Sequence, residues 1–221
     1  MLRTVILAAG CGSRIKTITK DPKCLLEIGG ESILERQIKE ATKPTVVVGY
    51  KKSKVSEIAK QYRAEIVYNP IWQHTNTLVS FLMAVANNKE DVYLINGDVV
   101  YEEEIIDQLY SESHSGCAVQ KLESQTDEEV KVLMNNNIVK NIGKHVNSNL
   151  ESVGVYFFKK EMVEYIKEMT ETLQKEPYQL YYEDVLNKCL DLPMGGVETN
   201  NAVEIDTPQD YKEAKRIHER K

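Results

Sequence analysis

The chain lacks any long hydrophobic run. Hydrophobic residues make up 42% of its 221 residues, yet no uninterrupted apolar stretch approaches the roughly 20 residues that a membrane-spanning helix needs. The start, MLRTVILAAGCGS, superficially resembles a secretory signal peptide, but its apolar run is too short and leads directly into a Gly-rich turn. The sequence therefore predicts a buried first strand and no membrane association.

An excess of positive charge is also missing. The chain has 28 Lys and Arg against 34 Asp and Glu, which gives a formal net charge of −6. Nucleic-acid-binding proteins instead concentrate Lys and Arg to neutralise phosphates. The composition therefore argues against general nucleic-acid binding, and any phosphate-binding site must be local.

Closely spaced cysteines are absent too. Cys11, Cys24, Cys117 and Cys189 are widely separated, with neither the CxxC spacing of a zinc site nor a dense disulfide framework. This usage suits a reducing cytoplasm, which is the location we expect. Cys11 stands in the Gly-rich loop, but no His follows it at a recognisable partner spacing, so a passive loop position is favoured over a nucleophile.

Strand and helix patterns alternate along the first hundred residues. Short apolar runs, several rich in β-branched residues, predict strands at 4–8, 45–48, 65–68 and 92–95. Amphipathic stretches between them predict helices at 32–41, 53–62 and 77–86. Ser32 is the expected cap of the first helix. Repeated strand, loop and helix units predict a doubly wound α/β core with a mainly parallel sheet flanked by helices.

From Gly116 onward the pattern changes to short strands joined by polar turns. The predicted strands are 117–120, 130–134, 137–142 and 153–158, with NNN at 135–137 as a tight connection. The predicted helices are 161–174, 182–189 and 208–220. We expect a small β-rich insertion that covers a site. No internal repeat, low-complexity linker or clean domain boundary is visible, so a single domain is expected.

The strongest chemical signal is a Gly-rich loop at the end of the first strand, LAAGCGSR at residues 7–14. Its two alanines and two glycines let the backbone approach a phosphate and turn N–H groups inward as an anion nest. Arg14 adds an always-charged fork for phosphate oxygens. The loop has neither the GK[ST] ending of a P-loop nor the dinucleotide fingerprint. These residues predict a phosphate loop, with an ordinary Gly turn and a surface Arg as the alternative.

Asp98 stands where a metal ion can be held, and Asp206 is a second carboxylate beside a predicted element. Asp98 follows the apolar strand of YLINGDVVY, and ligands of an open α/β sheet bind beyond the carboxyl ends of the strands. Asp206 precedes a predicted helix in VEIDTPQDYKEA. On the residues alone, Asp98 is more often a turn former than a ligand, because Gly97 beside it favours a bend, and Asp206 can be no more than a cap near Thr207 and Pro208. Asp210, farther along the helix, is expected to face solvent.

The segment HTNTLVSFLMA offers candidate contacts for a nucleotide base. Asn76 has both donors and acceptors, and Ser80 lies one helical turn on, so the two can read a pyrimidine edge together. The alternative is a helix N-terminus satisfied by Thr75 or Asn76, which the spacing supports equally well.

LAAGCGSR with DPKCLLEIGGESILERQI, residues 21–38, resembles the signature of the nucleotidyltransferase family that includes sugar-1-phosphate nucleotidyltransferases and small-molecule cytidylyltransferases. The resemblance implies a Rossmann-like nucleotide-diphospho-sugar transferase fold. It also implies Mg²⁺-dependent transfer of a nucleotidyl group from an NTP to a small phosphorylated or phosphonate acceptor, with release of pyrophosphate. By matching position, Arg14 and Lys23 are the catalytic cations, and Asp98 and Asp206 hold Mg²⁺. The implied nucleotide-binding residues are Leu7, Ala8, Ala9, Gly10, Gly12, Ser13, Arg14, Lys23, Asn76 and Ser80.

The later half resembles the acceptor-site elements of the phosphocholine and phosphonate cytidylyltransferase subgroup, with DEEVKV, IGKHV and ESVGVYFF in the same order. By this resemblance Lys131 and Lys144 attract the acceptor's dianion, while Glu129 and Glu151 hold a cationic or hydroxyl group. Each residue alone reads as a solvated charge. His145 stands where sugar-specific members usually have Pro, which favours CTP with phosphocholine, 2-aminoethylphosphonate or a related acceptor.

The resemblance spans nearly the whole chain, so we expect one nucleotidyltransferase domain at 1–221. Within it, 1–115 is the expected NTP-binding core and 116–221 the acceptor-binding and metal-completing part. A phosphate acceptor is already ionised at neutral pH, so no histidine is needed as a general base. The alternatives are a sugar-1-phosphate nucleotidyltransferase and a non-catalytic nucleotide-binding regulatory module. The expected partners are an NTP, with CTP favoured, and the acceptor, and the chain is expected to be a monomer or a homodimer.

Overall fold

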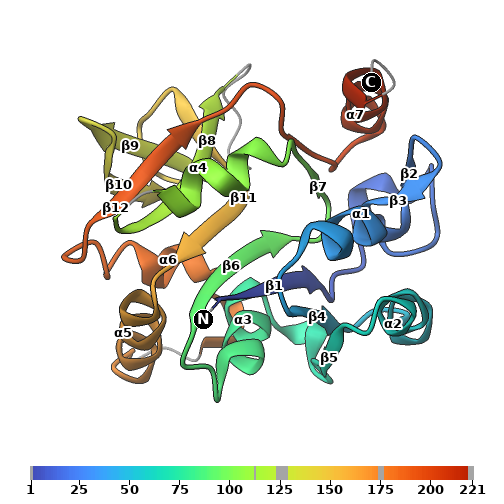
Figure 1. Cartoon of the computed structure of the whole chain (residues 1–221), viewed down its shortest axis with the longest axis horizontal. Helices are drawn as coiled ribbons and strands as arrows, with labels where there is room; N and C mark the ends of the chain where they lie inside the picture. The colour runs from blue at the N-terminus through green and yellow to red at the C-terminus, as the bar shows by residue number, and fades with distance from the viewer. Residues whose placement is uncertain (1, 112, 123–128, 174–176, 219–221) are drawn as a thin grey trace.

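The computed structural model describes residues 2–111, 113–122, 129–173 and 177–218. Within them a nine-stranded sheet crosses the molecule in the order β5-β4-β1-β6-β11-β8-β12-β10-β9 (Figure 1). Its strands are β1 (Leu2–Ala8), β4 (Pro44–Val48), β5 (Glu65–Tyr68), β6 (Asp91–Asn96), β8 (Ser115–Lys121), β9 (Lys131–Asn135), β10 (Ile138–Gly143), β11 (Leu150–Phe158) and β12 (Met194–Glu198). Two small pairs stand apart from it, β2 (Glu27–Ile28) with β3 (Glu31–Ser32) and β7 (Val99–Val100) with β13 (Val203–Glu204).

The parallel half of the sheet confirms the strands predicted before residue 100. β1 pairs in parallel with β4 on one side and β6 on the other, and β5 continues beyond β4. Because β4 and β6 lie on opposite sides of β1, the strand order reverses there, which is where open α/β sheets form their ligand crevice. The register places Leu7 beside Asn96. The Gly-rich loop and the segment after β6 therefore leave the sheet as neighbours.

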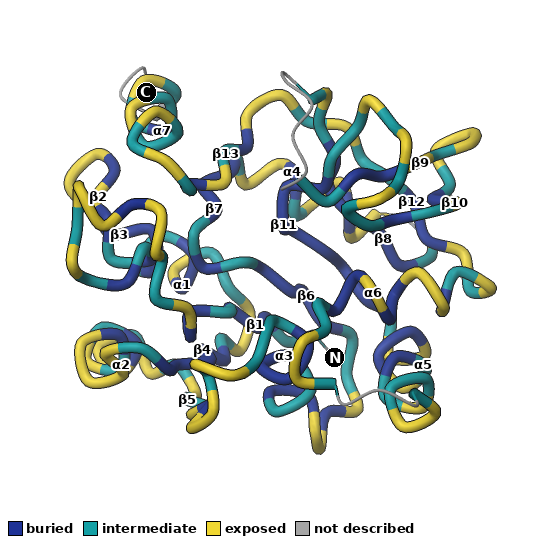
Figure 2. Tube along the Cα trace, turned by 180° about the vertical axis from the view of Figure 1, so that it is seen from behind, coloured by how far each residue is buried: buried dark blue, intermediate teal, exposed yellow. Residues whose placement is uncertain are grey.

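Helices cover both faces of the sheet, which confirms the doubly wound architecture. Their bounds are α1 (Ile33–Glu40), α2 (Lys52–Gln61), α3 (Thr77–Val85), α4 (Glu104–Ser111), α5 (Lys160–Glu171), α6 (Tyr182–Leu186) and α7 (Pro208–His218). Val5 packs in one core with α3, α5 and α6, whereas Ile6, facing the other way, packs with α1 and α2. α4 packs on the same face as Ile6, over β6 and β11. Figure 2 shows the sheet as the buried centre between more exposed helices.

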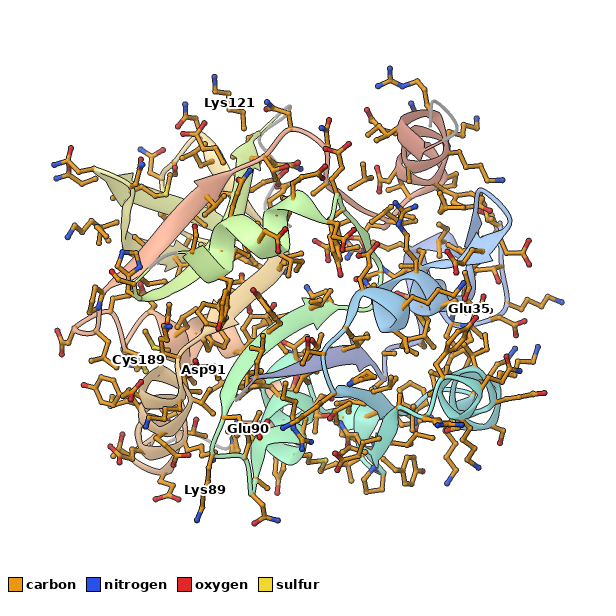
Figure 3. All side chains as sticks on the ribbon, in the orientation of Figure 1. Glu35, Lys89, Glu90, Asp91, Lys121 and Cys189 are labelled. Carbon is orange, nitrogen blue, oxygen red and sulfur yellow. The ribbon has the colours of Figure 1, made fainter. Side chains whose placement is uncertain are left out.

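Local chemistry explains several element boundaries. The Ser32 hydroxyl accepts from Glu35 N and the Glu35 carboxylate accepts from Ser32 N, a reciprocal capping box that begins α1. Asp91, labelled in Figure 3, accepts from Lys160 N at 2.9 Å and ties the start of α5 to β6. None of the helices in the described ranges has the length and apolar character needed to cross a lipid bilayer.

The strands predicted after residue 116 lie in the same sheet as the parallel half. β11 runs antiparallel between β6 and β8, and its register shifts between Ser152 and Tyr156. The predicted NNN turn is confirmed, since Asn136 and Asn137 both have positive φ between β9 and β10. β12 was not predicted because MGGVE has little strand propensity. A Cβ at its Gly196 would lie 1.9 Å from Met134 Sδ, so any larger residue there would displace the Met134 side chain.

α4 was also not predicted, and two predicted helices differ in extent. The helix expected at 182–189 ends at Leu186 and continues only as turns. The expected ends at Gln174 and Arg220 lie outside the described residues. The described parts of those two helices, α5 and α7, agree with the prediction, and α7 begins at Pro208 as expected.

Candidate active site

A cavity of about 230 Å³ opens at the carboxyl ends of β1 and β6. Its wall is formed by the Gly-rich loop, by the segment around Lys23, by the start of α3 and by the residues that follow β6. The cavity therefore lies at the point where the strand order reverses, the position expected for a ligand in this class of fold.

The Gly-rich loop supplies one wall of the cavity. Five of the predicted nucleotide-binding residues lie on that wall, namely Leu7, Ala8, Ala9, Gly10 and Gly12. Ser13 and Arg14 follow in a short 3₁₀ turn and do not line it. Gly12 has φ +57°, and a Cβ there would lie 2.5 Å from Lys23 Cγ. The absence of a side chain at Gly12 therefore leaves room for the Lys23 side chain to pack against the loop.

The four charged residues predicted from distant parts of the sequence meet beside this loop. Lys23 Nζ lies 2.7 Å from Asp98 Oδ2 and 2.5 Å from Asp206 Oδ1. Arg14 Nη2 lies 2.8 Å from the other carboxylate oxygen of Asp206. The Lys23 side chain is 13% exposed. Two cations and two anions thus form one compact, partly buried network.

Electrostatics keep Lys23 charged. Burial disfavours the ammonium, but the carboxylates of Asp98 and Asp206 outweigh this and raise the pKa of Lys23 above its ordinary value. Its buried neighbour Cys24 behaves oppositely, because burial and the charge of Asp98 raise the pKa of the thiol to about 12. Lys23 is therefore a permanent cation at neutral pH, whereas Cys24 is not an activated nucleophile.

The start of α7 leaves the Asp206 carboxylate available for cations. Asp210 Oδ2 accepts from the backbone N–H groups of Asp206 and Thr207, and Thr207 Oγ1 accepts from Asp210 N. Thr207 and Asp210 therefore cap the helix, and Asp210 is half-exposed, with its carboxylate also serving the helix start. Ile205 N donates to Asp98 O at 3.0 Å, which holds the two aspartates side by side.

The paired aspartates offer carboxylate oxygens suited to a divalent metal ion. Asp98 and Asp206 each bring an oxygen to the same ammonium nitrogen, so both can reach one cation. No group of three or more His, Cys, Asp and Glu side chains suited to a metal occurs among the described residues. A metal ion here would complete its shell with phosphate oxygens and water, as Mg²⁺ commonly does.

Glu204 is a further acidic residue of the cavity wall that was not predicted. Glu204 is exposed, and the negative charges of Asp98 and Asp206 beside it raise the pKa of its carboxyl above the ordinary value. The sequence did hold a signal for Glu204: in an extended segment, residues two apart such as Glu204 and Asp206 point to the same side. The cavity therefore holds more acidic groups than the motif alone indicated.

The start of α3 forms the opposite wall, where Asn76 and Ser80 were predicted. Both line the cavity. Asn76 Nδ2 donates to Gln179 O at 2.7 Å, and Ser80 Oγ accepts from Asn69 Nδ2 at 3.0 Å. The capping alternative is wrong, because no side-chain hydrogen bond from Asn76 caps α3 and Thr75 Oγ1 binds Asn69 and Ile71 instead.

Trp72, the chain's single tryptophan, also lines the cavity beside these polar groups. Its ring centroid lies 5.4 Å from that of Tyr50. Gly49 makes room for it, since a Cβ at that position would lie 2.8 Å from Trp72 Cβ. No periodic pattern marks Trp72 in the sequence, which is why it was not predicted.

The predicted acceptor residues lie outside the wall of this cavity, mostly around the start of β11. Glu151 is in register with Lys131 of β9 and accepts from Gln120 Nε2 at 2.9 Å. Lys131 is only 8% exposed, so the solvated-charge alternative is wrong for it, and its Nζ lies 3.4 Å from Lys144 O. Lys144 Nζ lies 4.8 Å from the ring centroid of Tyr181.

Glu129 directly precedes this group in the chain, two residues before β9. Of the DEEVKV segment on which the acceptor prediction rested, Asp127 and Glu128 lie outside the described residues. The structure therefore gathers three of the four predicted acceptor residues, and their roles stay predictions.

Comparison with known proteins places this geometry in context. The family described as "MobA-like NTP transferase domain" matches residues 4–183. The choline-phosphate cytidylyltransferase of Haemophilus influenzae is 28% identical over 226 residues, which cover 95% of this chain and 94% of that protein. The CMP-5'-(3-aminopropyl)phosphonate synthase of Streptomyces rubellomurinus is 33% identical over 118 residues, which cover 49% of this chain and 19% of that protein.

Among solved structures, the CTP:phosphocholine cytidylyltransferase of Streptococcus pneumoniae superposes with a TM-score of 0.79. The two chains are 23% identical, and the superposition covers 98% of each. At this level of identity the likeness establishes the fold.

Proposed function

We propose that this chain, which belongs to the family of MobA-like NTP transferase domains, is a Mg²⁺-dependent cytidylyltransferase that joins CMP to phosphocholine or an amino-alkyl phosphonate. Its class is that of a nucleotidyltransferase; the nucleotide, the metal and the acceptor are the proposal. The observation that carries it is the convergence of Arg14, Lys23, Asp98 and Asp206 beside a cavity at the carboxyl ends of β1 and β6.

In the proposed reaction an acceptor oxygen attacks the α-phosphorus of CTP in line. The new P–O bond forms as the bond from the α-phosphorus to the bridging oxygen of the β-phosphate breaks, and that electron pair leaves on pyrophosphate. A phosphate acceptor is already largely dianionic at neutral pH because its second pKa lies near 6. A general base is therefore unnecessary, and alignment and charge stabilisation supply the catalysis.

The residues of the network have distinct roles in this proposal. Arg14 and Lys23 bring two cations to the charge that grows on the departing pyrophosphate. Asp98 and Asp206 would hold Mg²⁺, which supplies further positive charge to the triphosphate. The backbone of the Gly-rich loop offers N–H groups to phosphate oxygens.

The residues proposed to bind the base share one wall of the cavity, and the acceptor is proposed from the names of two relatives. Trp72, Asn76 and Ser80 share one wall of the cavity, which combines an aromatic ring with polar groups that can hydrogen-bond a pyrimidine edge. The choice of CTP and of a phosphocholine-like or aminoalkyl acceptor is supported by the names of the two curated relatives. Glu129, Lys131, Lys144 and Glu151 are proposed to contact the acceptor.

A cytoplasmic location belongs to the same proposal. It is supported by the four cysteines, all of which are free thiols and therefore suit a reducing compartment. The partners proposed are CTP and the acceptor, with the chain acting as a monomer or a homodimer.

Pyrophosphate release from a matrix of substrates tests the proposal. CTP, UTP, dTTP and ATP are each combined with phosphocholine, 2-aminoethylphosphonate, glycerol phosphate and glucose 1-phosphate, with Mg²⁺ or with EDTA. We expect release only with CTP and an amino-alkyl acceptor, and only with Mg²⁺. Release with glucose 1-phosphate alone would overturn the acceptor and favour a sugar nucleotidyltransferase.

Tryptophan fluorescence supplies the binding control. Because Trp72 is the only tryptophan and lines the cavity, CTP bound there should change its emission. A change in emission without turnover for any acceptor would support a non-catalytic nucleotide-binding module and contradict the proposed enzyme.

A further inference from the structure

Gln37, in the second half of α1, is a buried polar residue to which the proposed mechanism gives no role. It is only 2% exposed, and it is the one polar residue among the four buried positions of α1, with Ile33, Leu34 and Ile38. The three aliphatic side chains pack in hydrophobic clusters. Burying an amide among them costs free energy unless hydrogen bonds compensate, so the hydrogen bonds of Gln37 must account for its presence.

The Gln37 amide group binds both ends of the turn that carries Asp98. Nε2 donates to Asn96 O at 3.0 Å and to Val99 O at 2.8 Å. Because both partners are carbonyl oxygens, which can only accept, the NH₂ group must face them. One side chain thus joins the residue that ends β6 to the residue that begins β7, and the Gly97–Asp98 dipeptide lies between these two points along the chain.

The amide oxygen of Gln37 has no comparable use. Oε1 is buried and accepts no hydrogen bond from the residues that the structure describes. A buried acceptor without a partner costs free energy, so the residue is poorly suited to a purely stabilising role. Its value lies in the two N–H groups that hold the turn beside the cavity.

Backbone contacts hold the middle of the same turn. Gly97 N donates to Leu7 O at 3.0 Å, and Asp98 O accepts from Ile205 N at 3.0 Å. A Cβ at Gly97 would lie 2.7 Å from Leu7 O, so the turn lies close against the end of β1. The Asp98 peptide is therefore fixed from β1, from the segment before α7 and, through Gln37, from α1.

A turn fixed in this way determines where the Asp98 carboxylate points. The carboxylate is 21% exposed and lies 2.7 Å from Lys23 Nζ, the nitrogen that Asp206 also contacts. Mg²⁺ requires a nearly ideal octahedral shell, so even a small shift of the turn would move one of its two proposed ligands out of place. Gln37 itself is not part of the cavity wall, and it can influence the site only through the turn.

We propose that Gln37 is a positioning residue, which holds the Asp98 carboxylate where it binds the metal ion. The inference rests on the proposed function, because it takes Asp98 as a ligand of Mg²⁺. Gln37 belongs to the segment 21–38 that resembles the nucleotidyltransferase signature, in which Lys23 is the residue with an assigned role.

Gln37→Met tests the inference, because methionine is similar in length but cannot donate a hydrogen bond. Pyrophosphate release with CTP and phosphocholine is measured over a range of Mg²⁺ concentrations. The Mg²⁺ concentration that gives half the maximal rate should rise by about tenfold. At saturating Mg²⁺ the KM for CTP should stay within about twofold of the wild-type value. Gln37→Leu, which suits the aliphatic neighbours of α1, replaces this variant should it fail to fold.

Asn88→Leu is the matched control. Asn88 is 8% exposed, and its Nδ2 donates to Glu90 O at 2.7 Å between α3 and β6. This variant also loses a buried amide donor, but at the opposite end of β6 from Asp98. Thermal unfolding should show a loss of stability, with the Mg²⁺ dependence of the rate unchanged. An equal change of Mg²⁺ dependence in both variants, or none in Gln37→Met, would overturn the inference.

A double-mutant cycle measures whether Gln37 acts through Asp98. At limiting Mg²⁺, Gln37→Met should lower turnover by about tenfold in the wild type. In Asp98→Asn the same change should lower it by less than about twofold, because the ligand that Gln37 positions is already lost. A full effect of Gln37→Met in Asp98→Asn would overturn the inference.

Failure of the proposed function would be visible separately, as a wild type that releases no pyrophosphate with any acceptor tested. Calorimetry and amide hydrogen exchange then decide the inference. Gln37→Met should bind Mg²⁺ about tenfold more weakly than the wild type. It should also exchange the Gly97 amide, which donates to Leu7 O, faster than Asn88→Leu does. Wild-type values for either quantity would overturn the assignment.

Discussion

Lys23 contacts both candidate metal ligands at once, since its ammonium nitrogen pairs with Asp98 and with Asp206. A divalent cation bound by those carboxylates must compete with this ammonium. In Lys23→Met we therefore expect tighter Mg²⁺ binding without nucleotide, by about tenfold, because a neighbouring positive charge has been removed. Turnover should fall by about 100-fold with a smaller loss of CTP binding, because the lysine acts on the charged transition state.

Calorimetric titration with Mg²⁺ and Trp72 fluorescence with CTP measure the two effects. Lys16→Met, which removes an exposed lysine from the same region of the chain, is the matched control and should bind Mg²⁺ as the wild type does. Weaker or unchanged Mg²⁺ binding in Lys23→Met would contradict competition for the two aspartates.

Asp98 tests the metal assignment directly. Asp98→Asn keeps the shape of the side chain but removes its charge, so turnover should fall by about 1,000-fold or more if the carboxylate binds the metal. Pyrophosphate release measures this loss, and far-UV circular dichroism should show an intact fold. Asp107→Asn, on the exposed side of α4, is the control. Near-wild-type turnover in Asp98→Asn would remove Asp98 from the metal site.

Single residues were predictable from sequence where a motif set their place. Arg14, Lys23, Asp98 and Asp206 do lie together, although their roles stay predictions. Trp72, Glu183 and Glu204 were not singled out, because an isolated aromatic or acidic residue carries no spacing signal. Glu183 in particular gains its character from burial between strands and a helix, which only the tertiary structure brings about.

At the scale of elements, the irregularity in β11 is the feature most closely tied to the site. Gly154 has a positive φ and lies against Asn96. Gly154→Ala should lower the free energy of unfolding by about 2 kcal/mol or more, because backbone strain is joined by a clash. It should also weaken turnover, because Asn96 lines the cavity.

Gly29→Ala is the matched control for this change. Gly29 also has a positive φ, but no atom lies within 4 Å of the added Cβ. Its cost should be limited to about 1 kcal/mol of backbone strain, with turnover unchanged. Urea unfolding and pyrophosphate release distinguish the two variants, and equal effects in both would show that contact with Asn96 is unimportant.

Elements were predictable where local and tertiary preferences agree. β4, with PTVVV, is buried at four of its five positions and has high strand propensity, and α1 has its cap in Ser32, so both were located nearly to the residue. β12 contains two glycines and exists because it pairs with β8 and passes close to Met134. Such a strand is specified by its neighbours, and sequence propensity cannot reveal it.

At the scale of the whole molecule, both halves of the chain share one core. Val5 and Leu94 of the parallel half pack in the same cluster as Val132, Tyr156 and Leu186 of the later half. A shared core of this kind favours one cooperative unfolding transition. The protonation of a buried group near the site should therefore be measurable in the stability of the entire chain.

Glu183 is the group whose protonation should appear most clearly. Burial raises its pKa from 4.5 to about 7. Between pH 4.5 and about pH 7, Glu183 holds a proton in the folded chain that it has lost in the unfolded chain. The free energy of unfolding therefore falls as the pH rises through this window. Above about pH 7, Glu183 is ionised in both states and its contribution to the free energy of unfolding no longer changes. The shift corresponds to a loss on the order of 3 kcal/mol.

Urea unfolding at pH 5, 6, 7 and 8, without ligands, checks this expectation. Glu204 and Glu40 also have raised pKa values, so they too contribute to the pH dependence of the wild type. The difference in the free energy of unfolding between the wild type and Glu183→Gln isolates the contribution of Glu183. The variant should be about as stable as the wild type at pH 5 and relatively more stable at pH 8. Parallel stability profiles of the two proteins would mean that folding does not raise the pKa of Glu183 and would contradict this expectation.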